Sequence, residues 1–171
     1  HVQYGLEVWG GNDTAKGKKR LQNIQKKAIR HISKSYYIAH TEPRMKSLGF
    51  LKIDDQYKLQ CAKLAHDMIN KNCPQNLQDT LNLSTESHTY SLRSAANNPL
   101  ELRENHTDRR ELRMSFSKMG PKVWNSIPET IRKIKNRDNF KNKLKSHILE
   151  GYASKLTCSN PLCHDKRFHL H

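Results

Sequence analysis

With 171 residues, the chain is long enough for one domain with a modest core or for two small lobes, and too short for most large multi-domain enzymes. Its 31 Lys and Arg against 16 Asp and Glu give a net charge of +15, which favours a nucleic acid as partner, with anionic lipid head groups as the alternative. Only 35% of the residues are hydrophobic, so we expect a thin core and no membrane span, which needs roughly 18 consecutive apolar residues.

A helix is predicted after the turn-rich stretch GGNDTAKG, because Leu21, Ile24, Ala28 and Ile32 recur at three- and four-residue spacing. Its other faces are basic, and no acidic residue occurs between Thr14 and Thr41. A solvated helix usually mixes signs to gain i,i+4 pairs, so this pattern indicates that an external anion supplies the countercharge. The alternative is an amphipathic helix with merely solvated lysines. The nucleic-acid-binding candidates on this segment are Lys18, Lys19, Arg20, Lys26, Lys27, Arg30 and Lys34.

Two more helices are predicted before the next proline-rich turn. A short one begins at Thr41 and ends at Gly49, with Met45 and Leu48 facing inward. A longer one follows, closed by Cys73-Pro74, and its apolar residues are Tyr57, Cys61, Leu64, Ala65, Met68 and Ile69.

The pair Asp54-Asp55 at the start of the longer helix has two interpretations. Adjacent aspartates hold two metal ions in polymerases, but there they lie on a strand hairpin. Here a helix-period run follows, so capping and the helix dipole explain both carboxylates better. Cys61 lies on the inward stripe and is interpreted as a small core hydrophobe rather than as a nucleophile.

Residues 75–119 form a predicted connector. A short helix is expected near Leu77 and Leu81, and the segments Thr89–Arg93 and Leu112–Phe116 alternate like short strands that would pair in one small hairpin.

The last third is again helical. Val123, Trp124 and Ile127 predict a short helix that Pro128 ends, and Phe140, Leu144 and Ile148 then mark one that ends near Gly151. Trp124 is interpreted as a core residue, with base stacking as the alternative. The nucleic-acid-binding candidates of this part are Arg132, Lys133, Lys135, Lys141 and Lys145.

Several segments, in order, resemble the C-terminal part of the reverse transcriptase of non-LTR (LINE-type, jockey-like) retrotransposons. They are YGLEVWG, LQNIQKKAIRHI, HTEPRMKSLGFLKIDDQYKLQCAKL and SFSKMGPKVWNSIPETIRKIKNRDNFKNKLKSHIL, and together they cover most of residues 2–150. The resemblance implies a position in and beyond the polymerase thumb, which grips template and primer during target-primed reverse transcription. It also implies that the catalytic aspartates belong to a palm upstream of YGLEVWG. We therefore expect no catalytic residue in this chain, although the parent protein would be an RNA-directed DNA polymerase.

The tail LTCSNPLCHDKRFHLH carries enough ligands for a tetrahedral zinc site, namely Cys158, Cys163, His169 and His171, with His164 as a substitute. LINE-type proteins often end in a Cys/His knuckle, but five residues between Cys163 and His169 are too few for a ββα finger. The alternative is a His-rich terminus without metal. The four cysteines form no dense disulfide framework, which favours an intracellular location in the nucleus or cytoplasm.

Together these patterns predict a mainly α chain, a small helical domain whose loosely structured connector allows one short β-hairpin. The expected segments are 1–74 (thumb-like), 75–119 (connector), 120–152 (C-terminal helical) and 153–171 (Cys/His-rich tail).

The expected function is binding of the phosphate backbone of RNA, DNA or their hybrid, beside the upstream polymerase core of the parent polyprotein. A helical module that docks on that core, or a decayed element remnant, are the alternatives. Val2, Tyr4, Leu6 and Trp9 are expected to pack on the Leu21 to Ile32 stripe.

Overall fold

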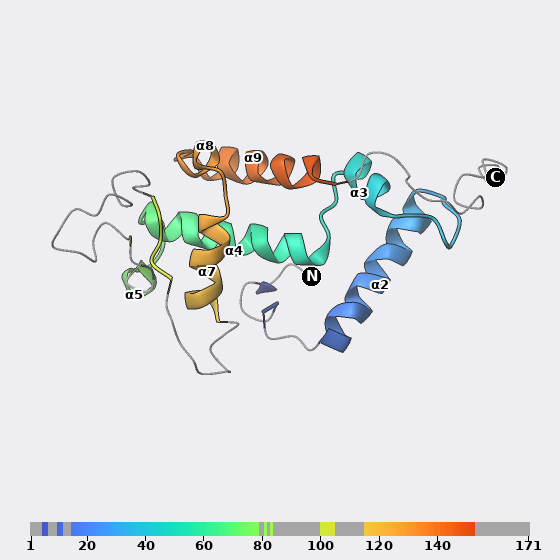
Figure 1. Cartoon of the computed structure of the whole chain (residues 1–171), viewed down its shortest axis with the longest axis horizontal. Helices are drawn as coiled ribbons and strands as arrows, with labels where there is room; N and C mark the ends of the chain where they lie inside the picture. The colour runs from blue at the N-terminus through green and yellow to red at the C-terminus, as the bar shows by residue number, and fades with distance from the viewer. Residues whose placement is uncertain are drawn as a thin grey trace. The chain divides into compact units, whose positions relative to one another are not determined.

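The computed structural model describes residues 5–6, 10–11, 15–78, 81, 83, 100–104 and 115–152. Within these residues the chain is mainly helical, which confirms the predicted fold class (Figure 1). The helices are α2 (Ala15–Ile32), α3 (Glu42–Leu48), α4 (Ile53–Ile69), α5 (Gln75–Gln78), α7 (Phe116–Asn125), α8 (Glu129–Arg132) and α9 (Arg137–Glu150).

Strand structure in the described residues is limited to an isolated antiparallel bridge between Leu83 and Leu102. The predicted strand Thr89–Arg93 lies outside the described residues, as does most of Leu112–Phe116. Phe116 itself is the first residue of α7, so the strand prediction is wrong at this position. The reason is local: Ser115 is extended, with ψ of 153°, and the chain turns into a helix directly after it.

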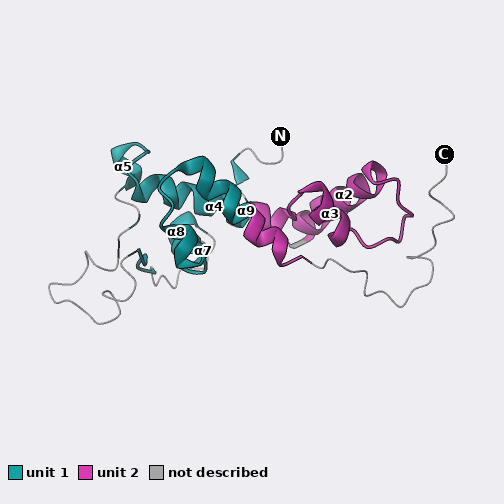
Figure 2. Cartoon of the chain, turned by 90° about the horizontal axis from the view of Figure 1, so that it is seen from above, with its two compact units in different colours: residues 1–12, 57–145 teal, residues 13–56, 146–171 magenta. Residues whose placement is uncertain are grey.

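The chain divides into two compact units (Figure 2). Unit 1 comprises residues 1–12 and 57–145, and unit 2 comprises residues 13–56 and 146–171. Each unit thus combines segments that are distant in the sequence. The four segments expected from the sequence are consecutive, so they do not correspond to these units.

Unit 1 has an aromatic core in which α9 lies alongside α4 and α7 crosses α4 (Figure 1). Trp124 of α7 and Phe140 of α9 are fully buried, with ring centroids 5.8 Å apart. The ring of His66 on α4 stacks on Phe140 at 4.4 Å and is also fully buried. Trp124 donates its indole N–H to the carbonyl oxygen of Leu100 at 2.7 Å. The interpretation of Trp124 as a core residue is therefore confirmed.

A smaller cluster in unit 1 buries Leu6 against Tyr57 and Cys61, with three partly buried residues around it, Phe116, Met119 and Val123. The structure therefore corrects the expectation for Leu6, because its partners are on α4 and α7 rather than on the Leu21 to Ile32 stripe. Val2, Tyr4 and Trp9 lie outside the described residues. Gly10 permits this packing, since a Cβ atom there would meet the Leu6 carbonyl oxygen at 2.5 Å and the Tyr57 ring at 2.7 Å.

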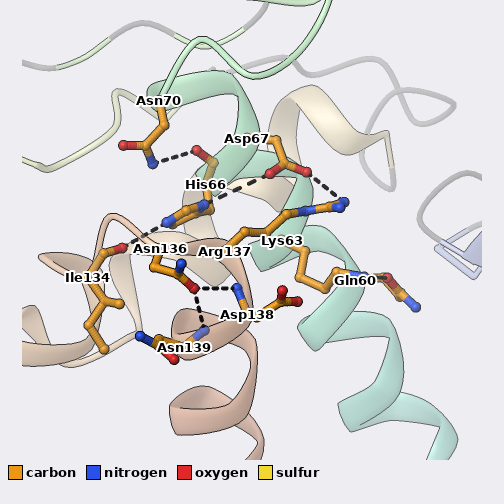
Figure 3. A network of polar contacts seen from close by, with 10 residues as sticks. All are labelled: Gln60, Lys63, His66, Asp67, Asn70, Ile134, Asn136, Arg137, Asp138 and Asn139. Atoms are coloured by element: carbon orange, nitrogen blue, oxygen red, sulfur yellow. Dashed lines mark hydrogen bonds and ion pairs between the residues drawn. The ribbon is translucent and has the colours of Figure 1, made fainter.

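Polar contacts of unit 1 fix the start of α9 (Figure 3). The side-chain oxygen of Asn136 accepts hydrogen bonds from the backbone N–H groups of Asp138 and Asn139, both at 3.0 Å, and so caps the helix. Arg137 pairs with Asp67 of α4 at 2.9 Å, and His66 Nε2 lies 2.8 Å from the carbonyl oxygen of Ile134. Of the three stripe residues predicted for this helix, Phe140 and Leu144 are buried, whereas Ile148 is only partly buried.

In α4 the predicted inward residues Tyr57, Cys61, Ala65 and Met68 are buried, as expected, whereas Leu64 and Ile69 are only partly buried. The helix ends at Ile69, before the predicted Cys73-Pro74. Lys71 explains the earlier end, because its φ of 58° lies in the left-handed region that terminates a helix.

In unit 2, α3 begins and ends where the sequence predicts. Gly49 follows it with φ of 67°, and its N–H bonds to the Lys46 carbonyl at 3.2 Å. Met45 is 2% exposed, as expected, but Leu48 is 42% exposed, so its predicted inward position is wrong.

Candidate nucleic-acid interface

Helix α2 has three faces, which follow from its periodicity of 3.6 residues per turn. The inner face, covered by the rest of unit 2, consists of Lys18, Gln22, Gln25 and Ile29. The outer stripe consists of Leu21, Ile24, Ala28 and Ile32. The basic face is the remaining part of the helix circumference, and its basic residues are Lys16, Lys19, Arg20, Lys26, Lys27, Arg30 and His31.

The apolar stripe predicted from the sequence is not the buried face, which is a correction. Ile24 is 63% exposed and Ile32 is 58% exposed, whereas Ile29 is 3% exposed. The inner face is held mainly by polar contacts. Gln22 donates to the Asp54 carboxylate at 2.6 Å, and Gln25 donates to the Leu51 carbonyl oxygen at 2.6 Å. The covered face of α2 therefore carries the hydrogen-bonded amides of Gln22 and Gln25, although apolar periodicity predicts apolar residues on a covered face.

Lys18 belongs to this inner face and not to the basic one. Its ammonium group forms an ion pair with Asp54 at 2.5 Å, and both side chains are partly buried. Arg30 is also engaged, because its Nε donates to the carbonyl oxygen of Ala39 at 2.9 Å. Of the predicted candidates on this segment, these two have structural partners.

The other candidates of this segment, Lys19, Arg20, Lys26, Lys27 and Lys34, have exposed side chains. None of them forms an ion pair with a residue in the described part of the chain. Lys34 lies just beyond the helix with φ of 46°, where the left-handed backbone ends α2. Lys16 was missed by the sequence argument, although it lies on the same row of the helix as Arg20 and Lys27.

The carboxylates of Glu42, Asp54 and Asp55 in unit 2 already have partners outside the basic face. Glu42 pairs with Lys52 at 3.0 Å, and Asp55 accepts a hydrogen bond from the Tyr152 hydroxyl at 2.6 Å. Asp54 holds Lys18 and Gln22. The basic face is thus left without internal countercharge in the described part of unit 2. Asp54 and Asp55 lie in the first turn of α4, as the helix-start interpretation predicts.

The second predicted cluster, in unit 1, is less uniform. Arg132 is only 7% exposed, and its guanidinium lies 3.4 Å from the Leu100 carbonyl oxygen that Trp124 also contacts. The structure thus places this side chain in the interior of unit 1 rather than on the exposed basic surface. Lys133 is exposed but pairs with Glu129 at 2.7 Å, and this contact lowers the pKa of the glutamate. Lys135 and Lys141 are exposed, and Lys145 is partly exposed.

A polar pocket lies beside the basic face, between α2 and α3. It has a volume of about 250 Å³. Its lining residues are Gln22, Gln25, Lys26, His40, Thr41, Glu42, Met45 and Lys52. No sequence motif marks this pocket, since its walls come from three segments, but Thr41 and Glu42 were recognisable as a helix start.

The proposed zinc ligands Cys158, Cys163, His164, His169 and His171 lie outside the described residues, so their arrangement is not part of this structure. Among the described residues no three His, Cys, Asp or Glu side chains gather in a group that could hold a metal ion. Cys61 is fully buried in the core of unit 1, in agreement with its interpretation as a small hydrophobe.

Comparison of the chain with protein-family models, with curated proteins and with solved structures gave no match. None of the described helices combines the length and the apolar character required to cross a bilayer.

Proposed function

We propose that the chain binds the phosphate backbone of RNA, DNA or their hybrid through the basic face of α2, with Lys133, Lys135, Lys141 and Lys145 of unit 1 as a second contact region. The observation that carries the proposal is the set of exposed cations on α2 that have no acidic partner in the described residues. Contacts of this kind position a nucleic acid without reading its sequence.

The distribution of charge along α2 supports a linear polyanion. Lys19 and Lys26 lie on one row of the helix, and Lys16, Arg20 and Lys27 lie on the next. Successive charges on one row are roughly 5 to 11 Å apart at about 1.5 Å per residue, a spacing that a phosphate backbone can match. Like charges so close together destabilise the helix, and a bound polyanion relieves this repulsion.

The parent protein of the proposal is a non-LTR retrotransposon reverse transcriptase, to which the ordered sequence segments are similar. In that setting the chain supplies backbone grip in and beyond the thumb, and the upstream palm supplies catalysis. The chain alone would then bind template and primer without polymerase activity.

A salt titration tests the proposed binding. If about five phosphates are neutralised, the logarithm of affinity for duplex DNA falls with the logarithm of salt concentration at a slope of about −4 to −5. Fluorescence anisotropy with a labelled duplex, measured from low to physiological salt, gives the slope. Affinity that is unchanged across this range would contradict backbone binding.

The outer stripe supports a second candidate function, a helical module that docks on the upstream polymerase core. Ile24 and Ile32 are more than half exposed on one row of α2, and apolar rows of this kind commonly cover a partner helix. Ile24→Asp should leave folding intact and abolish association with a separately expressed core. Leu77→Asp is the control, because Leu77 is also exposed, at 41%, but belongs to unit 1. Equal effects of the two substitutions would contradict a docking role of the stripe.

A further inference from the structure

The pocket between α2 and α3 has the size of a site for one small ligand. Its volume of about 250 Å³ lies just below the range of about 300–1,000 Å³ typical of small-molecule sites. Its size therefore suits a small ligand, such as a single building block of a polymer.

Several polar groups of the pocket have no partner in the described residues. Thr41 is 8% exposed, yet its side chain makes no capping bond to α3 and no other hydrogen bond there. Gln22 and Gln25 use their amide N–H groups on Asp54 and Leu51, which leaves both amide oxygens as acceptors. Polar groups at a partly enclosed site favour a ligand that can hydrogen-bond to them.

The charge of the pocket favours an anion. Glu42 is its only acidic lining residue, and Lys52 neutralises it at 3.0 Å. Lys26 has no acidic partner in the described part of the chain, and His40 is a further exposed lining residue. The two lysines and the one glutamate of the lining thus leave one surplus positive charge, on Lys26.

Lys26 belongs both to the lining and to the basic face, so a strand bound along α2 comes close to the pocket. Met45, which is 2% exposed, supplies an apolar wall, and a thioether packs well against a flat ring. A phosphate beside Lys26, hydrogen-bonding groups at Thr41 and the two glutamines, and an apolar wall at Met45 together match one nucleotide.

We propose that this pocket binds a single unpaired nucleotide of the strand held on α2, with its phosphate at Lys26 and its base toward Met45. The proposal rests on the proposed function and deepens it. Bases inside a duplex are stacked and cannot enter a pocket, so the ligand is a strand end, a bulged nucleotide or single-stranded nucleic acid.

The test is a titration of the full chain with AMP, followed through the NMR signals of ¹³C-methyl-labelled methionine. The Met45 methyl signal, assigned with Met45→Leu, should shift, whereas that of Met68 in unit 1 should not. Inorganic phosphate and adenosine serve as partial ligands, and each should bind more weakly than AMP. If inorganic phosphate binds as tightly as AMP, a nucleotide site is contradicted.

Three variants separate the pocket from general charge. Lys26→Met should weaken AMP binding about tenfold and Thr41→Val about fivefold, because each removes a hydrogen-bonding group of the pocket. Lys122→Met removes the same charge from an exposed position on α7, outside both the lining and the basic face, and should leave AMP affinity within about twofold. Circular dichroism of each variant verifies that the helices are retained.

The outcomes distinguish the two proposals. If AMP leaves the Met45 signal unshifted, or if Lys122→Met weakens AMP binding as much as Lys26→Met, the pocket proposal is overturned. Salt-dependent binding of a labelled strand would then still support the proposed function. If strand binding itself shows no salt dependence, the proposed function falls, whatever AMP does.

Discussion

The two compact units are stabilised in different ways. Of the largest fully buried side chains among the described residues, only Met45 belongs to unit 2, whereas Trp124, Phe140, Leu6 and their companions belong to unit 1. Unit 2 combines smaller buried apolar side chains, such as Ile29, Leu51 and Ile53, with hydrogen bonds and ion pairs. These polar contacts join α2 to residues near the start of α4, and Tyr152 to residues 46, 52 and 55.

This difference explains why two faces of α2 remain exposed. A core of large apolar side chains would have buried its outer stripe, and internal acids would have neutralised its basic face. Polar attachment through Lys18, Gln22 and Gln25 leaves both faces at the surface. The comparison therefore predicts that substitutions in unit 1 act mainly on stability, and that substitutions on these faces of α2 act mainly on binding.

The largest expected effect is at the centre of unit 1. Trp124→Ala should lower the free energy of unfolding by about 3–5 kcal/mol, because it leaves a cavity and removes the bond to Leu100. Urea denaturation followed by circular dichroism measures it. Trp124→Phe keeps most of the ring and should cost less. A loss below about 1 kcal/mol for Trp124→Ala would mean that the aromatic core does not stabilise unit 1.

The next effect compares two isoleucines of α2. Ile29→Ala should cost about 2–4 kcal/mol, because Ile29 is 3% exposed, whereas Ile24→Ala should change stability by at most about 0.5 kcal/mol. The two variants have the same composition and lie on one helix, so each is the control for the other. A larger loss of stability for Ile24→Ala than for Ile29→Ala would contradict this structure and would mean that the stripe predicted from the sequence is the buried face.

A smaller effect is expected at Tyr152, whose hydroxyl donates to Asp55 at 2.6 Å and accepts from the Lys52 N–H at 2.8 Å. Tyr152→Phe should cost about 1–2 kcal/mol, since it leaves both partners without this bond while the ring remains. Thermal unfolding of the two proteins side by side measures the difference. An unchanged melting temperature would show that these polar contacts contribute nothing to unit 2.

The smallest effect at neutral pH concerns tyrosine ionisation. Burial raises the pKa of Tyr152, and the nearby Asp55 carboxylate adds to this effect, while burial also raises the pKa of Tyr57. Since the folded-state pKa values are raised, the stability they contribute is complete below the unfolded value of about 10 and is lost as pH rises above it. Absorbance titration should show both tyrosines ionising only as the chain unfolds. Ionisation of every tyrosine near pH 10 without unfolding would contradict this prediction.

The sequence predicted most helices because their signals are local. Pro43 and Gly49 mark the ends of α3, and the apolar periodicity of α4 and α9 identifies residues that are in fact buried. It did not predict which face of α2 is covered, because periodicity identifies an apolar stripe and cannot say whether the surface that meets the helix is polar.

The burial of Arg132 and the existence of the pocket also could not be predicted from local sequence patterns. Arg132 has lysines close by in sequence, and its inward position depends on Leu100, which is 32 residues away. The pocket depends on Gln22, Thr41 and Lys52, which meet only in the folded unit. Exposure of the remaining candidates was easier to anticipate, since lysines are rarely buried without a partner.

The most direct test of the basic face compares Lys27→Glu with Lys122→Glu in binding to a labelled single-stranded RNA at low salt. Both lysines are exposed on helices, and both substitutions change the net charge equally, but only Lys27 belongs to the basic face of α2. Lys27→Glu should weaken binding about tenfold or more and reduce the magnitude of the salt slope by about one, whereas Lys122→Glu should change affinity by less than about twofold. Equal losses for the two variants would contradict the account, because binding would then depend on net charge rather than on the basic face.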